Sequence, residues 1–445
     1  MKVLRAHYYF ELSRLFNKIP YFDENVEISQ YPDIPNNEFT RDEILSMLAK
    51  EMLDAAEQLP ASQPEVGRIH KYIALAYAAK IKLYQAYQQD EITHAVTSIN
   101  KELLREVVSL CDQVTASNRY GLLDDFQGLD LVANENGKES VFAIQYSMND
   151  GTESAGRINW SNLLNSPGGG SPYGGDGFFL PSQDLINAYQ TDANGLPDFN
   201  YQSKSDYSWA VLNNGVYTLQ NTTPNVDPRL DFVVGRPTIT WKTYPDKPCE
   251  GWVRDKETYG YNCAKRFWVS PESSDMFNGW PWGASQLNWQ IIRYADILLW
   301  KAEALIELNE GNGLETARDL INQIRNRARN SAYVKDFNDH SKYAANYLVN
   351  PYPADVWNQD YARQALRWET RLEKALEGER FFDLVRWGIV ETTMNKYITA
   401  ESDNRIYYAN AHFTGGKDEY YPVPNNQYGF SGGKYVQNPG YAPFN

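Results

Sequence analysis

The densest group of potentially catalytic side chains lies in the segment Arg371–Gly388, RLEKALEGERFFDLVRWG. Its carboxylic acids are Glu373, Glu377, Glu379 and Asp383. Glycoside hydrolysis uses two carboxylates, about 5 Å or about 6.5–9.5 Å apart, on either side of the sugar bond. Residues three or four positions apart share one face of a helix and come close enough to form such a pair. The segment therefore raises the hypothesis of an all-helical glycoside hydrolase.

The same carboxylates alternate with arginines, and this favours a structural role. Arg371, Arg380 and Arg386 stand at helical spacing from the acids, as structural ion pairs do. Gly378, inside the predicted helix, would cost about 1 kcal/mol relative to alanine, so we expect a neighbour packed closely against it. We predict a buried ionic cluster rather than a catalytic pair. In it, Glu377 and Arg380 should be buried and paired with residues of neighbouring helices.

Other patterns that could support chemistry are weak. The five histidines are scattered, without HExxH or paired Cys/His spacing. The glycine-rich stretch Gly168–Gly177 lacks the GK[ST] of a phosphate-binding loop. Asp192, Asn194 and Asp198 in TDANGLPDFN offer oxygen ligands for Ca²⁺, but the spacing does not match an EF-hand and favours a turn. We predict no catalytic residue, no metal site and no cofactor.

The three cysteines exclude a dense disulfide framework. Cys111 falls in an apolar helical stripe and is expected to be a core thiol. Cys249 and Cys263 flank CEGWVRDKETYGYNC, which resembles a hairpin loop, and the sequence leaves open whether they form a disulfide.

Aromatic residues in loops are the best candidates for ligand binding. The chain has 32 Tyr and 12 Trp, whose rings combine apolar area with a polar tip and suit sugars and peptides. A loop Trp commonly lies in a small core beneath the loop. Trp280 and Trp282 differ, because the Pro/Gly-rich turn NGWPWG cannot easily bury both. Nearby amides and carboxylates are Asn159, Asn162, Asp206 and Asn213. The predicted ligand-binding residues are Trp160, Tyr173, Trp209, Trp280 and Trp282.

Apolar residues at helical spacing predict helices at both ends of the chain. The predicted ranges are Met1–Phe16, Thr40–Leu59, Gly67–Gln88, Leu103–Val114, Ile291–Leu308, Leu314–Ala328 and Arg363–Arg386. Thr40 and Glu43 form the pattern of a capping box. Two helices joined by the GNG turn at Gly311–Gly313, with small residues at their crossing, resemble a degenerate tetratricopeptide unit.

The middle of the chain has a different character. SVFAIQYS predicts a short strand and SQDLINAY a short helix, and most of the remainder is turn and loop. We expect one compact all-α unit, a tetratricopeptide-like helical scaffold with a large loop-rich insertion and few short strands. Its parts are residues 1–117 (helical), 118–288 (loop-rich ligand site) and 289–445 (helices and a wrapping tail). Each helical group alone is a thin layer with an exposed apolar face, so the two should meet in space.

The overall composition narrows the possible functions. The formal net charge of −15 argues against nucleic acid, whose phosphates carry the same sign. No apolar run approaches the length of a membrane span. Charged residues interrupt the opening MKVLRAHYYFELSRLF, which therefore does not resemble an export signal. Because this opening begins in the middle of an amphipathic helix without a cap, we expect the domain to be truncated at its start.

Several motifs, in this order, resemble the SusD/RagB family of Bacteroidetes nutrient-uptake lipoproteins. They are LRAHYYFELSRLFNKIPYF, DPRLDF, IIRYADILLWKAEAL, ARDLINQIRNRAR, EGERFFDLVRWG and the closing YPVPNN…VQNPGY. The resemblance covers essentially the whole chain. The family normally begins with a lipoprotein signal, an acylated cysteine and further helices, which this sequence lacks. The lipid anchor and part of the ligand site would then lie outside this chain.

The resemblance implies a non-catalytic glycan-binding protein at the cell surface, anchored in the outer membrane. It would deliver an oligosaccharide to a TonB-dependent transporter of the SusC type in polysaccharide utilisation. Three alternatives remain at this point. One is a peptide-capturing member of the same family, and the second is the glycoside hydrolase considered above. The third is a tetratricopeptide adaptor that binds only protein, which would not need the aromatic loop region.

Overall fold

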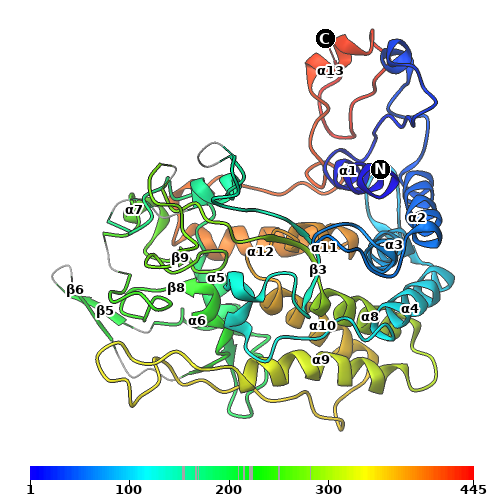
Figure 1. The fold of residues 1–445 in the computed structure, drawn as a ribbon. Helices are drawn as coiled ribbons and strands as arrows, with labels where there is room; N and C mark the ends of the chain where they lie inside the picture. Colours follow the sequence, from blue (N-terminus) through cyan, green and yellow to red (C-terminus); the bar gives the residue numbers. More distant parts are fainter. Residues whose placement is uncertain are drawn as a thin grey trace.

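The computed structural model describes residues 1–152, 156–165, 168, 170–208, 210–213, 216–219, 224–248, 251–280 and 282–444. Its main body is a row of packed helices (Figure 1). The first group is α1 (Lys2–Phe16), α2 (Arg41–Gln58), α3 (Lys71–Ala86) and α4 (Lys101–Thr115). The second group is α8 (Tyr294–Leu308), α9 (Gly313–Asn330), α10 (Gln359–Glu373), α11 (Arg380–Arg386) and α12 (Val390–Ser402). Helix α4 packs against α8, so the prediction that the two groups meet in space is confirmed.

Local sequence explains where these helices begin. At the start of α2 the Thr40 hydroxyl accepts a hydrogen bond from the Glu43 backbone N–H, and the Glu43 carboxylate accepts one from the Thr40 N–H. This reciprocal pair satisfies two backbone donors that a helix leaves free in its first turn. The predicted capping box is therefore confirmed. Ile291, predicted as helical, instead belongs to strand β10 (Trp289–Arg293), and α8 starts directly after it.

The continuous helix predicted over Arg363–Arg386 is wrong. Helix α10 ends at Glu373 and α11 begins at Arg380. Between them Leu376 and Gly378 have φ of +65° and +82°, in the left-handed region that interrupts a helix. A Cβ on Gly378 would meet no atom of the described residues within 4 Å, so the expected close neighbour is not found among them. The glycine is used there for its backbone conformation.

The other regular secondary structure consists of short β-strands. The described part of the chain contains five two-stranded antiparallel sheets. They are β1 (Tyr87–Gln89) with β2 (Val96–Ile99), β3 (Ser140–Ile144) with β10, β4 (Gln190–Thr191) with β7 (Asn225–Val226), β5 (Ala210–Asn213) with β6 (Val216–Leu219), and β8 (Val234–Gly235) with β9 (Cys263–Ala264). Strand β3 is the one predicted from SVFAIQYS.

The helices in the described part of the loop-rich middle are all short. The α-helical ones are α5 (Gln183–Ala188), as predicted from SQDLINAY, α6 (Arg229–Val233) and α7 (Lys256–Tyr259). The 3₁₀-helices in it are η2 (Phe126–Asp130), η3 (Val132–Asn134), η4 (Trp160–Asn165) and η5 (Tyr201–Ser203). Three further short helices lie outside it: η1 (Ile28–Asp33), η6 (Ile406–Tyr408) and α13 (Asn425–Phe430). The predicted helix-rich scaffold with a loop-rich insertion is thus confirmed.

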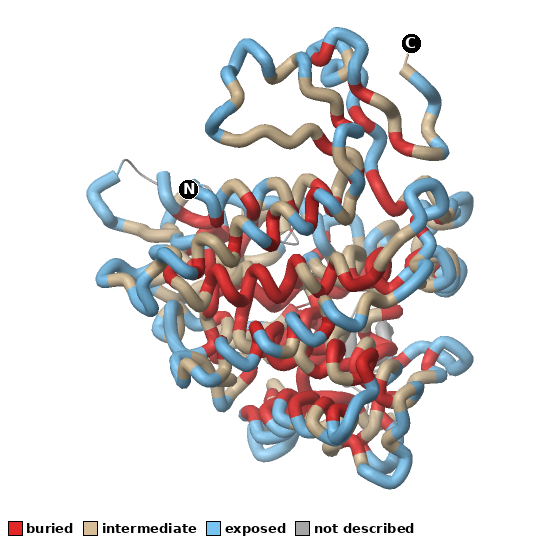
Figure 2. Tube along the Cα trace, turned by 90° about the vertical axis from the view of Figure 1, so that its right-hand side faces the viewer, coloured by how far each residue is buried: buried red, intermediate tan, exposed pale blue. Residues whose placement is uncertain are grey.

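The core runs along the helical row. Helices α1–α4 share one cluster of buried apolar residues with part of α8, and α8–α10 share another. Figure 2 shows the middle of this body buried, with the loops around it mostly exposed. The C-terminal tail first packs Phe413 and Tyr420 against the helices and then leaves them. Its end, with α13, projects beside the loop that follows α1 (Figure 1), where Asn36 hydrogen-bonds to the backbone of Val436.

A buried histidine where the tail meets the body should make stability depend on pH. His94 is 4% exposed, its ring packs edge-on against Tyr420, and its Nε2 has no hydrogen-bond partner among the described residues. Burial lowers the pKa of His94 to about 4. In the unfolded chain the imidazole has a pKa of about 6.5. Between about pH 4 and pH 6.5 it is therefore protonated in the unfolded state and neutral in the folded state. Stability should therefore be complete above pH 6.5 and fall as the pH approaches 4.

The wild-type free energy of unfolding should fall between about pH 7 and pH 5. We expect this fall to be about 1 kcal/mol smaller in His94→Gln, allowing for solvent screening. Urea denaturation of wild type and variant at both pH values measures this difference. His412→Gln, which changes an exposed histidine, is the matched control and should leave the loss unchanged. Equal pH dependence in all three proteins would show that His94 is not the titrating group.

Candidate functional site

Glu373 and Glu377, two acidic residues of Arg371–Gly388, lie in the interior, paired with cations from distant segments. Glu373 is fully buried and lies 2.6 Å from Arg293 Nη1 and 3.2 Å from Arg229 Nη1, with a further contact to Arg327. Burial alone would raise the pKa of Glu373, and the three guanidinium groups overcome it and lower the pKa to about 2. Its carboxylate is thus held ionised with no solvent-facing side.

Glu377 and Glu379 are paired in the same way. Glu377 is 8% exposed and contacts Arg266, Arg293 and Lys374. Glu379 lies 2.7 Å from Arg14 and 3.2 Å from Lys80. The prediction of a buried ionic cluster is confirmed for Glu373 and Glu377, whereas Glu379 is partly exposed and links α1 and α3 to the C-terminal helices. We call Glu373, Glu377 and their cationic partners the ionic clasp.

The prediction for Arg380 is wrong. This side chain is half-buried and forms no ion pair within the part of the chain that the structure describes, and its Nη1 is buried without a hydrogen-bond partner there. Burial, together with the neighbouring charge of Arg371, lowers the pKa of Arg380 to about 9. Glu373 and Glu377 instead take their arginines from other elements, at Arg229, Arg266, Arg293 and Arg327.

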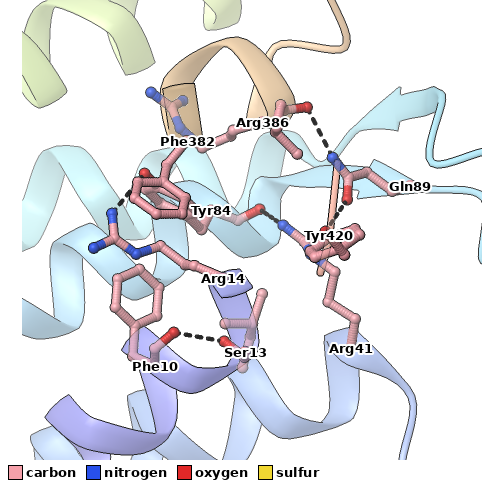
Figure 3. A pocket seen from close by; sticks show the side chains of 11 residues that line it. Phe10, Ser13, Arg14, Arg41, Tyr84, Gln89, Phe382, Arg386 and Tyr420 are labelled. Carbon is pink, nitrogen blue, oxygen red and sulfur yellow. Dashed lines mark hydrogen bonds between the residues drawn. The ribbon is translucent and has the colours of Figure 1, made fainter. Parts of the chain in front are cut away.

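A cavity at the α1–α3–α11 junction is also unsuited to a ligand (Figure 3). Arg14, Arg41 and Arg386 surround Tyr84 there, and the Arg14 guanidinium lies 4.1 Å from the centre of the Phe382 ring. The cavity volume is about 20 Å³. Since a single water needs at least about 10–15 Å³ of such space, the cavity has no room for a sugar. It is part of the packing around the first helix.

Exposed tryptophans gather where two loops of the middle region meet. Trp160, Trp280 and Trp282 are 42%, 68% and 56% exposed. The rings of Trp160 and Trp280 have centroids 5.5 Å apart and planes at 68°. A hydrogen bond from the Asn159 N–H to the Ser285 carbonyl (2.9 Å) ties the two loops together beside them. Two indole rings from segments more than a hundred residues apart are thereby held against each other at the surface.

Trp282 follows Trp280 by two residues and lies against the glycine-rich loop. A Cβ on Gly174, whose φ is +66°, would lie 3.5 Å from the Trp282 Cβ, so this loop passes directly along the tryptophan. The backbone N–H of Phe178 donates to the Leu164 carbonyl (3.0 Å), which joins the end of the loop to η4. Trp160, Trp280 and Trp282 form what we call the aromatic surface.

Sequence reasoning missed three apolar neighbours in these loops. Leu164, Phe178 and Phe179 are 48%, 58% and 44% exposed, and Phe179 has a φ of +63°, uncommon for an aromatic residue. The signal was present in the sequence DGFFLP, where two phenylalanines follow a run of turn residues. Two expected polar partners are not available: Asn159 and Asn162 are buried, and Asn162 donates to the Phe267 carbonyl.

Tyr173 is buried, so the expectation that it presents an exposed ring is wrong. It is 0% exposed and packs with Trp241 and Trp268 in a small core under the loops. Its hydroxyl donates to the Val269 carbonyl (2.7 Å) and accepts from Trp241 Nε1 (2.9 Å). These two bonds give a buried hydroxyl the partners it needs. Trp209, the fifth predicted residue, lies outside the described residues.

We expect Tyr173→Phe to lower the free energy of unfolding by about 1–3 kcal/mol, because it leaves the buried Trp241 N–H and Val269 carbonyl without their partner. Urea denaturation measures the loss. Tyr407→Phe, at a tyrosine that is 49% exposed, is the matched control and should change stability little. An unaltered midpoint in the Tyr173 variant would contradict this packing.

The possible calcium-binding turn and the cysteines have structural roles where the structure describes them. Asp192 accepts hydrogen bonds from the Asn194 and Leu196 N–H groups, which confirms the predicted turn. Cys111 is a buried core thiol, as predicted, whereas Cys249 lies outside the described residues and its pairing stays untested. Among the described residues no group of three His, Cys, Asp or Glu side chains could hold a metal ion, and no helix is long and apolar enough to cross a membrane.

Comparison with known proteins identifies the family. The model of the SusD family matches residues 138–441, more than half of the chain. The chain belongs to the SusD family. The predicted resemblance is thereby confirmed.

Individual relatives are distant. SusD-like protein P2 of Formosa agariphila is 24% identical, over 98% of this chain and 72% of its own length. A SusD-like protein of Bacteroides ovatus is 22% identical, over 87% of this chain, which spans only 58% of that relative. A solved structure of a laminarin-binding SusD-like protein superposes with a TM-score of 0.65 at 20% identity, covering 99% of this chain and 77% of that one. This likeness supports the SusD-like helical fold.

Proposed function

We propose that this SusD-family protein binds an oligosaccharide on the aromatic surface without cleaving it. The observation that carries the proposal is the exposed pair Trp160–Trp280, with Trp282 beside it. Flat rings held rigidly at the surface stack on the C–H faces of sugars, and their rigidity limits the entropy lost on binding. Membership in the family and the laminarin-binding relative of the same fold support a glycan as the ligand.

The absence of catalysis is proposed from the acidic residues. Glu373 and Glu377, two of the carboxylates first considered for catalysis, lie buried against arginines and a lysine, where neither a sugar nor an attacking water reaches them. A glycosidase instead needs one carboxyl group protonated and both facing the substrate. The low pKa of Glu373 is opposite to that of a general acid.

A binding screen tests both parts of the proposal. We expect calorimetry to detect binding of at least one oligosaccharide in a panel that includes β-glucans such as laminarin fragments. The same mixtures should show no new reducing ends after prolonged incubation. Peptides form a second arm of the panel. Binding of peptides but not of glycans would favour the peptide-capturing alternative, and release of reducing ends would favour a glycoside hydrolase.

The cellular role follows from the family and is part of the proposal. We propose that the protein lies at the outer-membrane surface, held by a lipid anchor. We propose that it delivers its glycan there to a SusC-type TonB-dependent transporter. Isolation of the protein from outer membranes should recover such a transporter with it. Recovery without any transporter, from membranes in which both are intact, would contradict this partnership.

A further inference from the structure

A large cavity lies apart from the aromatic surface and has no role in the proposed function. Its volume is about 740 Å³, which falls in the range of about 300–1,000 Å³ typical of small-molecule sites. Helices η2 and η3 form one wall, and the segments around Lys242 and Lys265 form the other. The apolar part of the lining includes Leu131, Phe232 and Val269.

One buried and one half-buried lysine line this cavity, Lys265 and Lys242. Lys265 is 2% exposed, and its Nζ donates to the backbone carbonyls of Asp231 (2.7 Å) and Thr240 (2.9 Å). Lys242 Nζ has one hydrogen bond to the described residues, at 3.2 Å to Asp130 Oδ2. An ammonium group has three donors, so Lys265 keeps one and Lys242 keeps two for another partner.

The carboxylates nearby are already occupied. Asp130 Oδ1 accepts from Arg266 Nε and the Phe267 N–H, so this one acid serves two cations. Both oxygens of Asp231 accept from Arg236. Within the described chain Lys265 has no ion pair of its own. Burial, together with the neighbouring charges of Lys242 and Arg236, lowers the pKa of Lys265 to about 7 against the opposing effect of Asp231. Lys242 thus shares its carboxylate with Arg266, and the ammonium group of Lys265 contacts backbone carbonyls in place of a carboxylate.

Backbone strain is concentrated at the same place. Lys242 has a φ of +48°, and Thr238 and Phe267, in the adjoining segments, have φ of +73° and +67°. Each non-glycine residue in this region costs on the order of 1–3 kcal/mol, and such residues cluster at binding sites. The chain therefore holds Lys242 in an unfavourable conformation that places its amine beside Asp130 and the cavity.

We propose that this cavity binds a small organic monocarboxylate with an apolar body, its carboxylate on Lys242 and Lys265. The carboxylate would take the spare ammonium donors, and the apolar body would lie on Leu131, Phe232 and Val269. Charge-assisted hydrogen bonds of this kind are about twice as strong as neutral ones. Asp124 and Glu272, which line the cavity and are exposed, put negative charge at its solvent end. They disfavour a multiply charged anion such as phosphate.

Calorimetry with 3-phenylpropionate as the probe tests the proposal on the whole chain. We expect it to bind at millimolar concentrations or below. The uncharged 3-phenylpropanamide, which has the same body, and inorganic phosphate should both bind at least about tenfold more weakly. Lys242→Met should weaken 3-phenylpropionate about tenfold or more, because it removes two of the donors. Asp130 would still keep Arg266 and the Phe267 N–H.

Lys138→Met is the matched control. Lys138 lines the same cavity, but it is exposed and its Nζ pairs with Asp124 at 2.9 Å. This variant, like Trp280→Ala in the aromatic surface, should bind 3-phenylpropionate as wild type does. The control separates a specific contact from the general loss of one positive charge.

A measurement on the wild type keeps the test decisive if Lys242→Met does not fold. Affinity for 3-phenylpropionate should fall between about pH 6 and pH 8.5, as Lys265 loses its proton. The charged or titratable groups that face Lys265 are Asp231, Lys242, Arg236 and Cys263. Absence of binding, equal binding of the amide or of phosphate, or an equal loss in Lys138→Met would each overturn the proposal. A flat pH profile would overturn the part assigned to Lys265.

Discussion

Replacing Arg293 by alanine is expected to lower the free energy of unfolding by about 3–5 kcal/mol, among the largest effects of a single substitution. Arg293 is 1% exposed and ends strand β10. Its guanidinium lies 3.0 Å from Glu139, 2.6 Å from Glu373 and 2.9 Å from Glu377. Alanine would leave three buried carboxylates short of a cation, and a buried charge without its partner costs far more than a surface pair contributes. Urea denaturation at neutral pH measures the loss.

Arg380→Ala is the matched control for this prediction. It removes a half-buried arginine that has no ion pair in the described structure, so the expected loss is below about 1 kcal/mol. Equal losses in the two variants would contradict the assignment of the ionic clasp. The pH dependence of the free energy of unfolding is a second test. The depressed pKa of Glu373 contributes stability above about pH 4.5 that is lost as the pH falls towards 2, and Arg293→Ala should lose less over this interval.

The clasp illustrates what local spacing predicts and what it cannot. The alternation of acids and arginines in Arg371–Gly388 indicated ion pairs rather than catalysis, and the carboxylates are indeed paired. Their partners Arg229, Arg266 and Arg293 come from segments some 80 to 145 residues away, and nothing in the local pattern points to them. Helical periodicity also passes over two residues with positive φ, because it records which positions are apolar and not their backbone conformation.

The loop region shows the same division. Trp280 and Trp282 are exposed as predicted, because proline and glycine on either side leave no regular element to bury them. Tyr173, with similar neighbours in sequence, is buried, because Trp241 and Val269 supply partners for its hydroxyl from a distant part of the chain. Its environment depends on long-range contacts between loops, whereas that of the tryptophans depends on their own turn.

Trp280→Ala is expected to weaken glycan binding about thirtyfold or more, a loss of about 2 kcal/mol typical of a tryptophan at the centre of an interface. Trp280 is the most exposed of the three tryptophans, and its edge-to-face contact with Trp160 fixes the ring before a ligand arrives. Trp160→Ala should weaken binding too, by removing both a ring and the support of Trp280. Calorimetry against a glycan found in the screen measures each change.

Phe430 offers a matched control for the tryptophan variants. Phe430→Ala removes an aromatic ring that is 56% exposed on α13, in the projecting end of the chain and away from the loop region (Figure 1). It should leave glycan affinity unchanged. The tryptophan variants should keep nearly the wild-type free energy of unfolding, because exposed rings contribute little to the core. If their affinity matches wild type, or if they lose stability as core residues do, the aromatic surface is not the glycan site.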